Sequence, residues 1–164
     1  MKKHLFALLL LFVGNFVDGQ SVWTLDKGHS RIGFTVTHHM ISEVDGYFRD
    51  YEGKITVTKE DFSDAVFELT VQTSSINTEN ERRDGHLKSA DFFDVENFPK
   101  AHFALTSFVR NGDDVTAEGN LTLRGVTAPV TLTGEIGGPA TDPWGNEKVS
   151  ASLTGKISRK AWGL

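Results

Sequence analysis

Residues 115–123 have the sequence Val115-Thr116-Ala117-Glu118-Gly119-Asn120-Leu121-Thr122-Leu123, in which small or apolar residues alternate with polar ones. A period of two places successive side chains on opposite faces of a β-strand. The odd-numbered residues therefore form a dry face, and the even-numbered residues form a wet face. The same alternation recurs over residues 31–39, 51–57, 67–71, 101–105, 130–136 and 149–157.

Turn-forming residues separate these stretches. They occur at Lys59-Glu60-Asp61, at Asn111-Gly112-Asp113-Asp114, at Arg124-Gly125, and from Gly137-Gly138-Pro139 through Asp142-Pro143. Asn-Gly between two apolar runs is a strong signal for a tight β-hairpin. Antiparallel strands with one dry face need a second layer, which a sandwich or a closed barrel supplies. Short hairpins favour the barrel, so we predict an all-β fold built on an antiparallel barrel of about eight strands.

One segment breaks the alternation. Thr78-Glu79-Asn80-Glu81 has the form of a capping box, in which Glu81 would reach back to the backbone amide of the capping threonine. The sequence therefore predicts a short helix over about residues 79–89. Leu87, and then Phe92 and Phe93, give this segment an apolar side. We expect the helix to cover one end of the β structure.

The N-terminus has the pattern of a secretory signal peptide. Lys2 and Lys3 precede an apolar run over residues 5–13, which is too short to span a bilayer as a helix. Val17 and Gly19 supply the compact residues that a signal peptidase requires. We predict a signal peptide over residues 1–19, cleavage before Gln20, and a mature domain over residues 20–164 in the periplasm or outside the cell. A retained N-terminal anchor is the alternative.

Composition narrows the classes of function. The chain has 164 residues, which suits one domain, and a net charge of −5. Nucleic acid is not an expected partner, because phosphate backbones attract basic surfaces. No later apolar stretch is long enough for a membrane-spanning helix, so stable membrane insertion is not expected. The absence of cysteine excludes disulfides and thiolate metal sites.

The aromatic residues point to a binding cavity. There are 12 Phe residues, and Phe34, Phe67 and Phe103 lie on dry strand faces beside small residues such as Gly119 and Gly134. Large residues next to small ones could frame an elongated apolar cavity. The alternative is a filled core, in which the small residues only make room for the aromatic rings.

The sequence contains no evident catalytic or metal-binding motif. GxSxG, HExxH and P-loop motifs are absent, and no two histidines have the spacing of metal ligands. His38 falls on a dry face, where an imidazole needs a partner, so it is a candidate contact for a ligand head group or, alternatively, a haem iron. The charged group Arg82, Arg83, Asp84 and His86 is interpreted as helix-surface ion pairs or an ordered network at a cavity mouth.

Three separated blocks resemble the YceI-like family. Residues 29–38 are similar to the opening strand of these proteins, residues 83–95 with Phe98-Pro99 to their central helix and its exit, and residues 119–130 to their late hairpin. The resemblance implies an extended, lipocalin-like barrel with a helix near one opening, in a periplasmic or secreted protein that is not an enzyme and has no cofactor. It also implies an apolar lipid partner, such as a polyisoprenoid or a quinone tail, and homodimers among family members. Family members continue beyond the segment that Trp162-Gly163-Leu164 resembles, which predicts that this chain is truncated at its C-terminal end.

These considerations together predict a carrier that holds a long apolar lipid. Its tunnel wall is predicted to comprise Phe34, Val36, Phe67, Leu69, Phe103, Leu105, Leu121 and Leu132, with His38, Phe92 and Phe93 nearer a mouth. No catalytic or metal-ligating residues are predicted. A fatty acid or fatty amide is the alternative ligand. The alternative functions are an enzyme that acts on a lipid head group and a filled barrel that acts through its surface.

Overall fold

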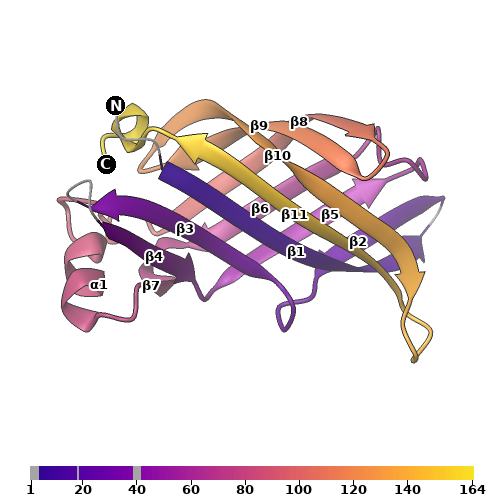
Figure 1. Cartoon of the computed structure of the whole chain (residues 1–164), viewed down its shortest axis with the longest axis horizontal. Helices are drawn as coiled ribbons and strands as arrows, with labels where there is room; N and C mark the ends of the chain where they lie inside the picture. The colour runs from indigo at the N-terminus through magenta and orange to yellow at the C-terminus, as the bar shows by residue number, and fades with distance from the viewer. Residues whose placement is uncertain (1–3, 18, 39–41) are drawn as a thin grey trace.

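The computed structural model describes residues 4–17, 19–38 and 42–164, and it has the predicted all-β architecture (Figure 1). The elements in chain order are β1 (His4–Val17), β2 (Gln20–Leu25), β3 (Arg31–His38), β4 (Ser42–Phe48), β5 (Tyr51–Val57), β6 (Val66–Gln72), the 3-10 helix η1 (Thr73–Ser75), β7 (Ile76–Asn77), α1 (Glu81–Lys88), β8 (Lys100–Asn111), β9 (Asp114–Leu123), β10 (Val126–Thr141), β11 (Glu147–Ile157) and the 3-10 helix η2 (Arg159–Trp162).

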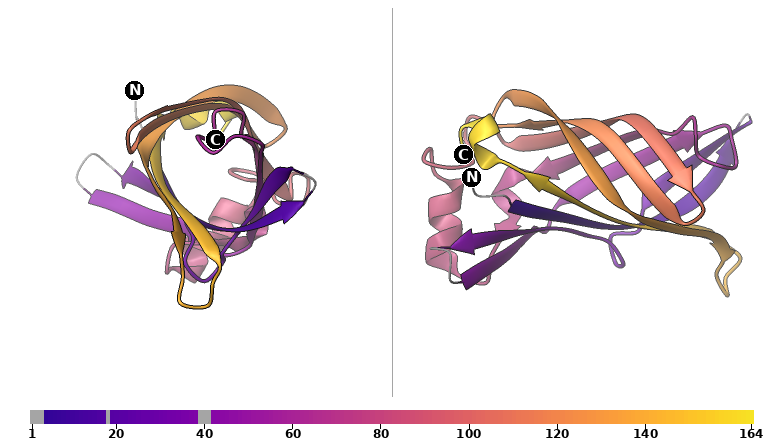
Figure 2. Two further views of the ribbon diagram at one scale, coloured as in Figure 1. Left: turned by 90° about the vertical axis from the view of Figure 1, so that its right-hand side faces the viewer. Right: turned by 45° about the horizontal axis from the view of Figure 1, so that its top comes forward.

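The strands form a closed antiparallel barrel (Figure 2). At three positions around the barrel, two shorter strands take the place of one long strand. β2 and β3 both pair with β1; β5 then pairs with β2 and β4 with β3, and β6 pairs with β5 and β7 with β4. The eleven strands therefore occupy eight positions around the barrel. The pairing of β1 with β11 closes the circle, so the predicted eight-stranded barrel is confirmed.

β1 is the strand that joins the two ends of the sheet. Its residues pair with β11 on one side and with β3 and β2 on the other. Leu8, Leu10 and Phe12 point inward and are almost completely buried against inward residues of β11. This strand lies within the segment that the sequence predicts as a signal peptide. The structure is that of the uncleaved chain, so cleavage before Gln20 stays a prediction.

The seven strands expected from alternation are present, and β1, β2, β4 and β7 are additional. The hairpin at Asn111–Asp114 forms as predicted, with Gly112 at a φ of 65°. The turn region predicted from Gly137-Gly138-Pro139 through Asp142-Pro143 is confirmed at Asp142-Pro143, where the chain turns between β10 and β11, and is wrong for its first part. Gly137-Gly138-Pro139 lie inside β10, where a bulge before Ala140 shifts the register with β11 and lets the strand continue to Thr141.

The predicted helix is confirmed, but its predicted cap is wrong. Asn80 caps α1, and its Oδ1 accepts a hydrogen bond of 3.0 Å from the Arg83 backbone amide. Thr78 instead donates its hydroxyl to the Asp84 carboxylate at 2.6 Å. Because the Thr78 hydroxyl bonds to the Asp84 carboxylate, it does not cap the helix, and Asn80 is the cap instead. None of the helices in the described ranges is long and apolar enough to cross a membrane.

The two ends of the barrel differ. α1 and η2 lie at the same end, and the β10–β11 hairpin extends from the opposite end (Figure 1). Along β9 the side chains of Val115, Ala117, Leu121 and Leu123 are buried inside the barrel, as the alternation predicts. The core therefore lies within the ring of strands, and the helical segments cover one end of it.

Candidate functional site

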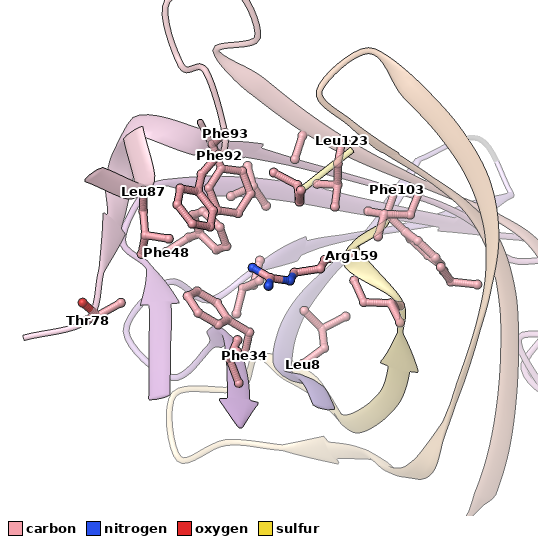
Figure 3. Close-up of a pocket in the computed structure, with 18 of the residues that line it drawn as sticks. Leu8, Phe34, Phe48, Thr78, Leu87, Phe92, Phe93, Phe103, Leu123 and Arg159 are labelled. Atoms are coloured by element: carbon pink, nitrogen blue, oxygen red, sulfur yellow. The ribbon is translucent and has the colours of Figure 1, made fainter. Parts of the chain in front are cut away.

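The barrel encloses a cavity of about 410 Å³ near the α1 end (Figure 3). This volume falls in the range of about 300–1,000 Å³ that is typical of small-molecule sites. Most of its wall is apolar. The wall comes from strands on all sides of the barrel, from α1, from the segment that follows α1 and from the C-terminal segment that contains η2. The apolar lining comprises Leu8, Ile32, Phe34, Val36, Val44, Phe48, Leu69, Val71, Leu87, Phe92, Phe93, Ala101, Phe103, Leu121, Leu123, Val130, Leu132, Ile157 and Leu164.

The structure brings most of the predicted wall residues to this cavity. Those that line it are Phe34, Val36, Leu69, Phe92, Phe93, Phe103, Leu121 and Leu132. Phe67 and Leu105 lie elsewhere, because they line a smaller cavity of about 50 Å³ further along the barrel. The side chain of His38 lies outside the described residues. A role in ligand binding stays a prediction for all of them.

Phe103 forms the inner end of the main cavity. It and Leu132 border both cavities and therefore separate them. The ring of Phe103 packs against Phe67, with 6.0 Å between ring centroids. A Cβ atom on Gly119 would lie 2.4 Å from this ring, so glycine is needed there for the ring to pack over the neighbouring strand β9. The filled-core interpretation thus holds around Gly119, although open space remains beyond the ring.

An aromatic group frames the outer part of the cavity. Phe48 packs edge-on against Phe93 with 5.8 Å between ring centroids, and it also packs against Phe34 at 5.9 Å. Gly46 makes this possible, because a Cβ atom there would lie 2.3 Å from the Phe34 ring. Sequence reasoning missed Phe48, since Asp45-Gly46 interrupts the apolar alternation of β4.

A buried polar network fixes α1 at this end of the barrel. The Asp84 carboxylate accepts from the Thr78 backbone amide at 2.9 Å and from the Thr78 hydroxyl at 2.6 Å. Arg83 donates from Nε to the same hydroxyl oxygen and from Nη2 to the Thr78 carbonyl, both at 2.7 Å. Thr78 and Asp84 are buried. Arg83 and Asp84 therefore form, with Thr78, the ordered network at the mouth that the sequence suggested as one alternative. Arg82 and His86, the other two residues of that group, are exposed and take no part in it.

The opposite side of the mouth is formed by η2, which is anchored at several points. Trp162 is buried, and its indole Nε1 donates to the Leu121 carbonyl at 3.0 Å. Arg124 donates to the Gly163 carbonyl at 2.8 Å and to the Ala90 carbonyl at 2.7 Å, so it joins η2 to the segment after α1. This anchored turn directs the side chain of Arg159 into the cavity (Figure 3).

None of the polar residues in the described cavity lining is acidic. These polar residues are Thr78, Arg83, His86, His102 and Arg159. His86 lies 3.2 Å from the Asp91 carboxylate, and the His102 ring lies 3.3 Å from the Thr70 hydroxyl. The described residues contain no cluster of His, Cys, Asp and Glu that could hold a metal ion. The geometry thus offers an apolar chamber with cationic groups at one end.

Comparison with known proteins agrees with this architecture. The sequence pattern of the YceI-like domain matches residues 23–164. The chain belongs to the YceI-like family. Protein YceI of Salmonella agona is 36% identical over 168 aligned residues, which cover 100% of this chain and 88% of the relative.

Solved structures show the same fold. The YceI protein of Campylobacter jejuni has a TM-score of 0.69 and 36% identity, and the match covers 84% of this chain and 81% of that one. BcnA of Burkholderia cenocepacia has a TM-score of 0.65 at 15% identity, covering 79% of this chain and 98% of that one. The second likeness concerns the fold alone.

Several lining residues of this YceI-like chain were missed for different reasons. Alternation had placed Val71, Ala101, Leu123, Val130 and Ile157 on dry faces, so the pattern could have identified them. Leu8 was assigned to the signal peptide. For Arg159 no sequence signal exists, because its direction depends on how η2 is anchored.

Proposed function

We propose that this YceI-like protein binds one long-chain apolar lipid inside its barrel. The observation that carries the proposal is the cavity of about 410 Å³, whose wall is formed almost wholly by Leu, Ile, Val and Phe side chains. An apolar chamber with an aromatic frame at one end suits a flexible hydrocarbon chain. A polyisoprenoid or a quinone tail is the proposed ligand, and a fatty acid or fatty amide is the second candidate.

Removal of the lipid chain from water would drive binding. Each buried methylene group contributes about 0.8 kcal/mol, so ten of them contribute about 8 kcal/mol before other terms. Association itself costs about 4–15 kcal/mol in lost freedom of motion. A tail of more than ten carbons therefore gives useful affinity, whereas a short acyl chain does not. This reasoning predicts affinity that rises with chain length until the cavity is full.

The test begins with protein purified from its own source without detergent. Native mass spectrometry should show an adduct of lipid mass, and extraction should release a molecule with a long hydrocarbon chain. The extracted protein is then titrated with the neutral fluorophore N-phenyl-1-naphthylamine, and farnesol is used to displace it. A bare protein mass combined with no uptake of either probe would contradict lipid binding.

Export is a further part of the proposal; cleavage before Gln20 would remove β1, so the barrel and cavity described above are those of the uncleaved chain. Lys2-Lys3 followed by a short apolar run supports it. In the uncleaved chain this run lies within β1, where Leu9 is 49% exposed on the outer face and Leu10 is buried. Leu9→Lys should leave the melting temperature of the uncleaved protein nearly unchanged, because surface substitutions seldom exceed about 0.5 kcal/mol. The same charge should prevent export, since a signal peptide needs an uninterrupted apolar core.

Cell fractionation and N-terminal sequencing provide the measurement. Wild-type protein recovered outside the cytoplasm with Gln20 as its first residue would support export by cleavage. Wild-type protein that stays in the cytoplasm with Met1 intact would contradict it. Thr154→Lys is the matched control, because it adds the same charge to the exposed face of β11 opposite β1.

A further inference from the structure

We propose that the bound lipid carries an anionic head group, a carboxylate or a phosphate, and that Arg159 binds it. This inference rests on the proposed function and specifies the ligand class. The head group would lie at the α1 and η2 end, and the tail would extend toward Phe103. Three features of the described residues support this placement.

The first feature is the position of Arg159. Its side chain points into the cavity that Phe34 and Phe48 also line, and it is only partly exposed (Figure 3). A guanidinium in a largely apolar cavity has lost part of its hydration, which is costly unless an acceptor replaces the water. Within the described part of the chain, the Arg159 side chain makes neither an ion pair within 4.0 Å nor a hydrogen bond. Its planar fork matches carboxylate and phosphate oxygens.

The second feature is the rigidity of the turn that carries it. Trp162 fixes η2 to β9 through its bond to Leu121, and Arg124 holds the Gly163 carbonyl. The Leu164 amide also donates to the Arg159 carbonyl at 3.1 Å. These bonds hold the backbone of Arg159 before any ligand arrives. Less conformational freedom is then lost when an anion binds.

The third feature is the sign of the charges around the cavity. The whole chain carries a net charge of −5, yet its described cavity lining includes Arg83 and Arg159 and no acidic side chain. Arg83 is already bonded to Thr78, and His86 lies beside Asp91. Arg159 is therefore the lining cation best placed to receive a ligand oxygen. A neutral head group would leave this charge without a counterion.

The experiment compares lipids that differ only in the charge of the head group. Hexadecanoate is paired with hexadecanol, and farnesyl monophosphate is paired with farnesol. Each is used to displace N-phenyl-1-naphthylamine from the delipidated full chain. A hydrogen-bonded charge should make the anion of each pair bind about ten- to hundredfold more tightly. A preference in one pair alone also supports the proposal and identifies the head group.

Variants test the assignment to Arg159. Arg159→Gln should abolish the preference while changing the affinity for farnesol less than about threefold. Arg159→Lys should keep part of the preference, because it retains the charge and loses the fork. Lys160→Gln is the matched control, since it removes the same charge from an exposed residue of the same turn and should leave the preference intact.

The outcomes separate this proposal from the proposed function. Equal affinity of wild-type protein for both members of each pair overturns the anionic head group and leaves lipid binding intact. A preference that survives in Arg159→Gln overturns the role of Arg159. Failure of all four lipids to bind overturns lipid binding, and the head-group proposal with it. The wild-type comparison decides the question of charge even where a variant fails to fold.

Discussion

Replacement of Phe103 by alanine should lengthen the tail that the barrel accepts. Phe103 and Leu132 stand between the cavity of about 410 Å³ and the smaller one of about 50 Å³. Loss of the ring removes the larger part of this partition and joins the two spaces. Each additional methylene that enters the new space should contribute about 0.8 kcal/mol, or about fourfold in affinity. The wild-type barrel should reach its maximum affinity at a shorter chain length than the variant.

The substitution also has a cost in stability that can be estimated. Phe103 is 5% exposed and packs against Phe67, so truncation to alanine should reduce the free energy of unfolding by about 3–5 kcal/mol. A typical domain has about 5–15 kcal/mol in total, so the variant should still fold. Phe103→Leu is a milder version with the same expected direction.

The assay is displacement of N-phenyl-1-naphthylamine by primary alcohols of increasing chain length. Neutral alcohols keep the result independent of any head-group contact. Phe62→Ala is the control, because Phe62 is equally buried and lines the smaller cavity without bordering the larger one. The control should lose stability without the same gain for longer chains. A folded Phe103→Ala protein with the wild-type dependence on chain length would refute the idea that Phe103 limits the cavity.

Three further predictions concern stability. Trp162→Phe removes the indole donor to the Leu121 carbonyl in a buried place, and it should cost about 1–3 kcal/mol in urea unfolding; an unchanged midpoint would mean that this bond does not anchor η2. Gly85→Ala should stabilise the protein by about 0.5–1 kcal/mol in the same assay, because Gly85 lies inside α1 and an added Cβ atom meets nothing within 4 Å; a loss of stability would contradict this. The pKa of Asp26 is lowered, chiefly by the hydrogen bond from Lys148, so its ionised form stabilises the fold above about pH 4 and this contribution is lost as pH falls further. Asp26→Asn should therefore reduce the difference in melting temperature between pH 7 and pH 3, and an equal difference in both proteins would be the contrary result.

The parts of the fold that follow from local pattern were predictable. Alternation identified strands such as β9 because every second side chain meets the core, and Asn111-Gly112 identified its hairpin because two adjacent residues suit a tight turn. The cap of α1 was not predictable from spacing alone. Thr78, Asn80 and Asp84 are all able to bond to the helix end or to one another, and the buried position of Asp84 decides which of them do.

The sequence predicted several of the residues that line the cavity, but it did not predict where the cavity ends. Strand parity correctly placed Phe34 and Leu121 at the cavity wall, since parity determines which face looks inward. It could not show that the ring of Phe103 packs over Gly119, because that depends on the register between β8 and β9. Arg159 was out of reach for the same reason. Its direction results from the anchoring of η2 by residues that are distant in sequence.

The two faces of β1 explain why this strand escaped prediction. On the inward face, Leu8 and Leu10 supply apolar side chains that are buried in the barrel core. Outward, Ala7 and Leu9 are exposed beside the Thr154 and Ser152 positions of β11, where a barrel strand needs no apolar side chain. Alternation is therefore missing, and alternation is the signal by which strands are recognised. Burial accounts for one face of this segment, and the proposed role as the apolar core of a signal peptide would account for the other.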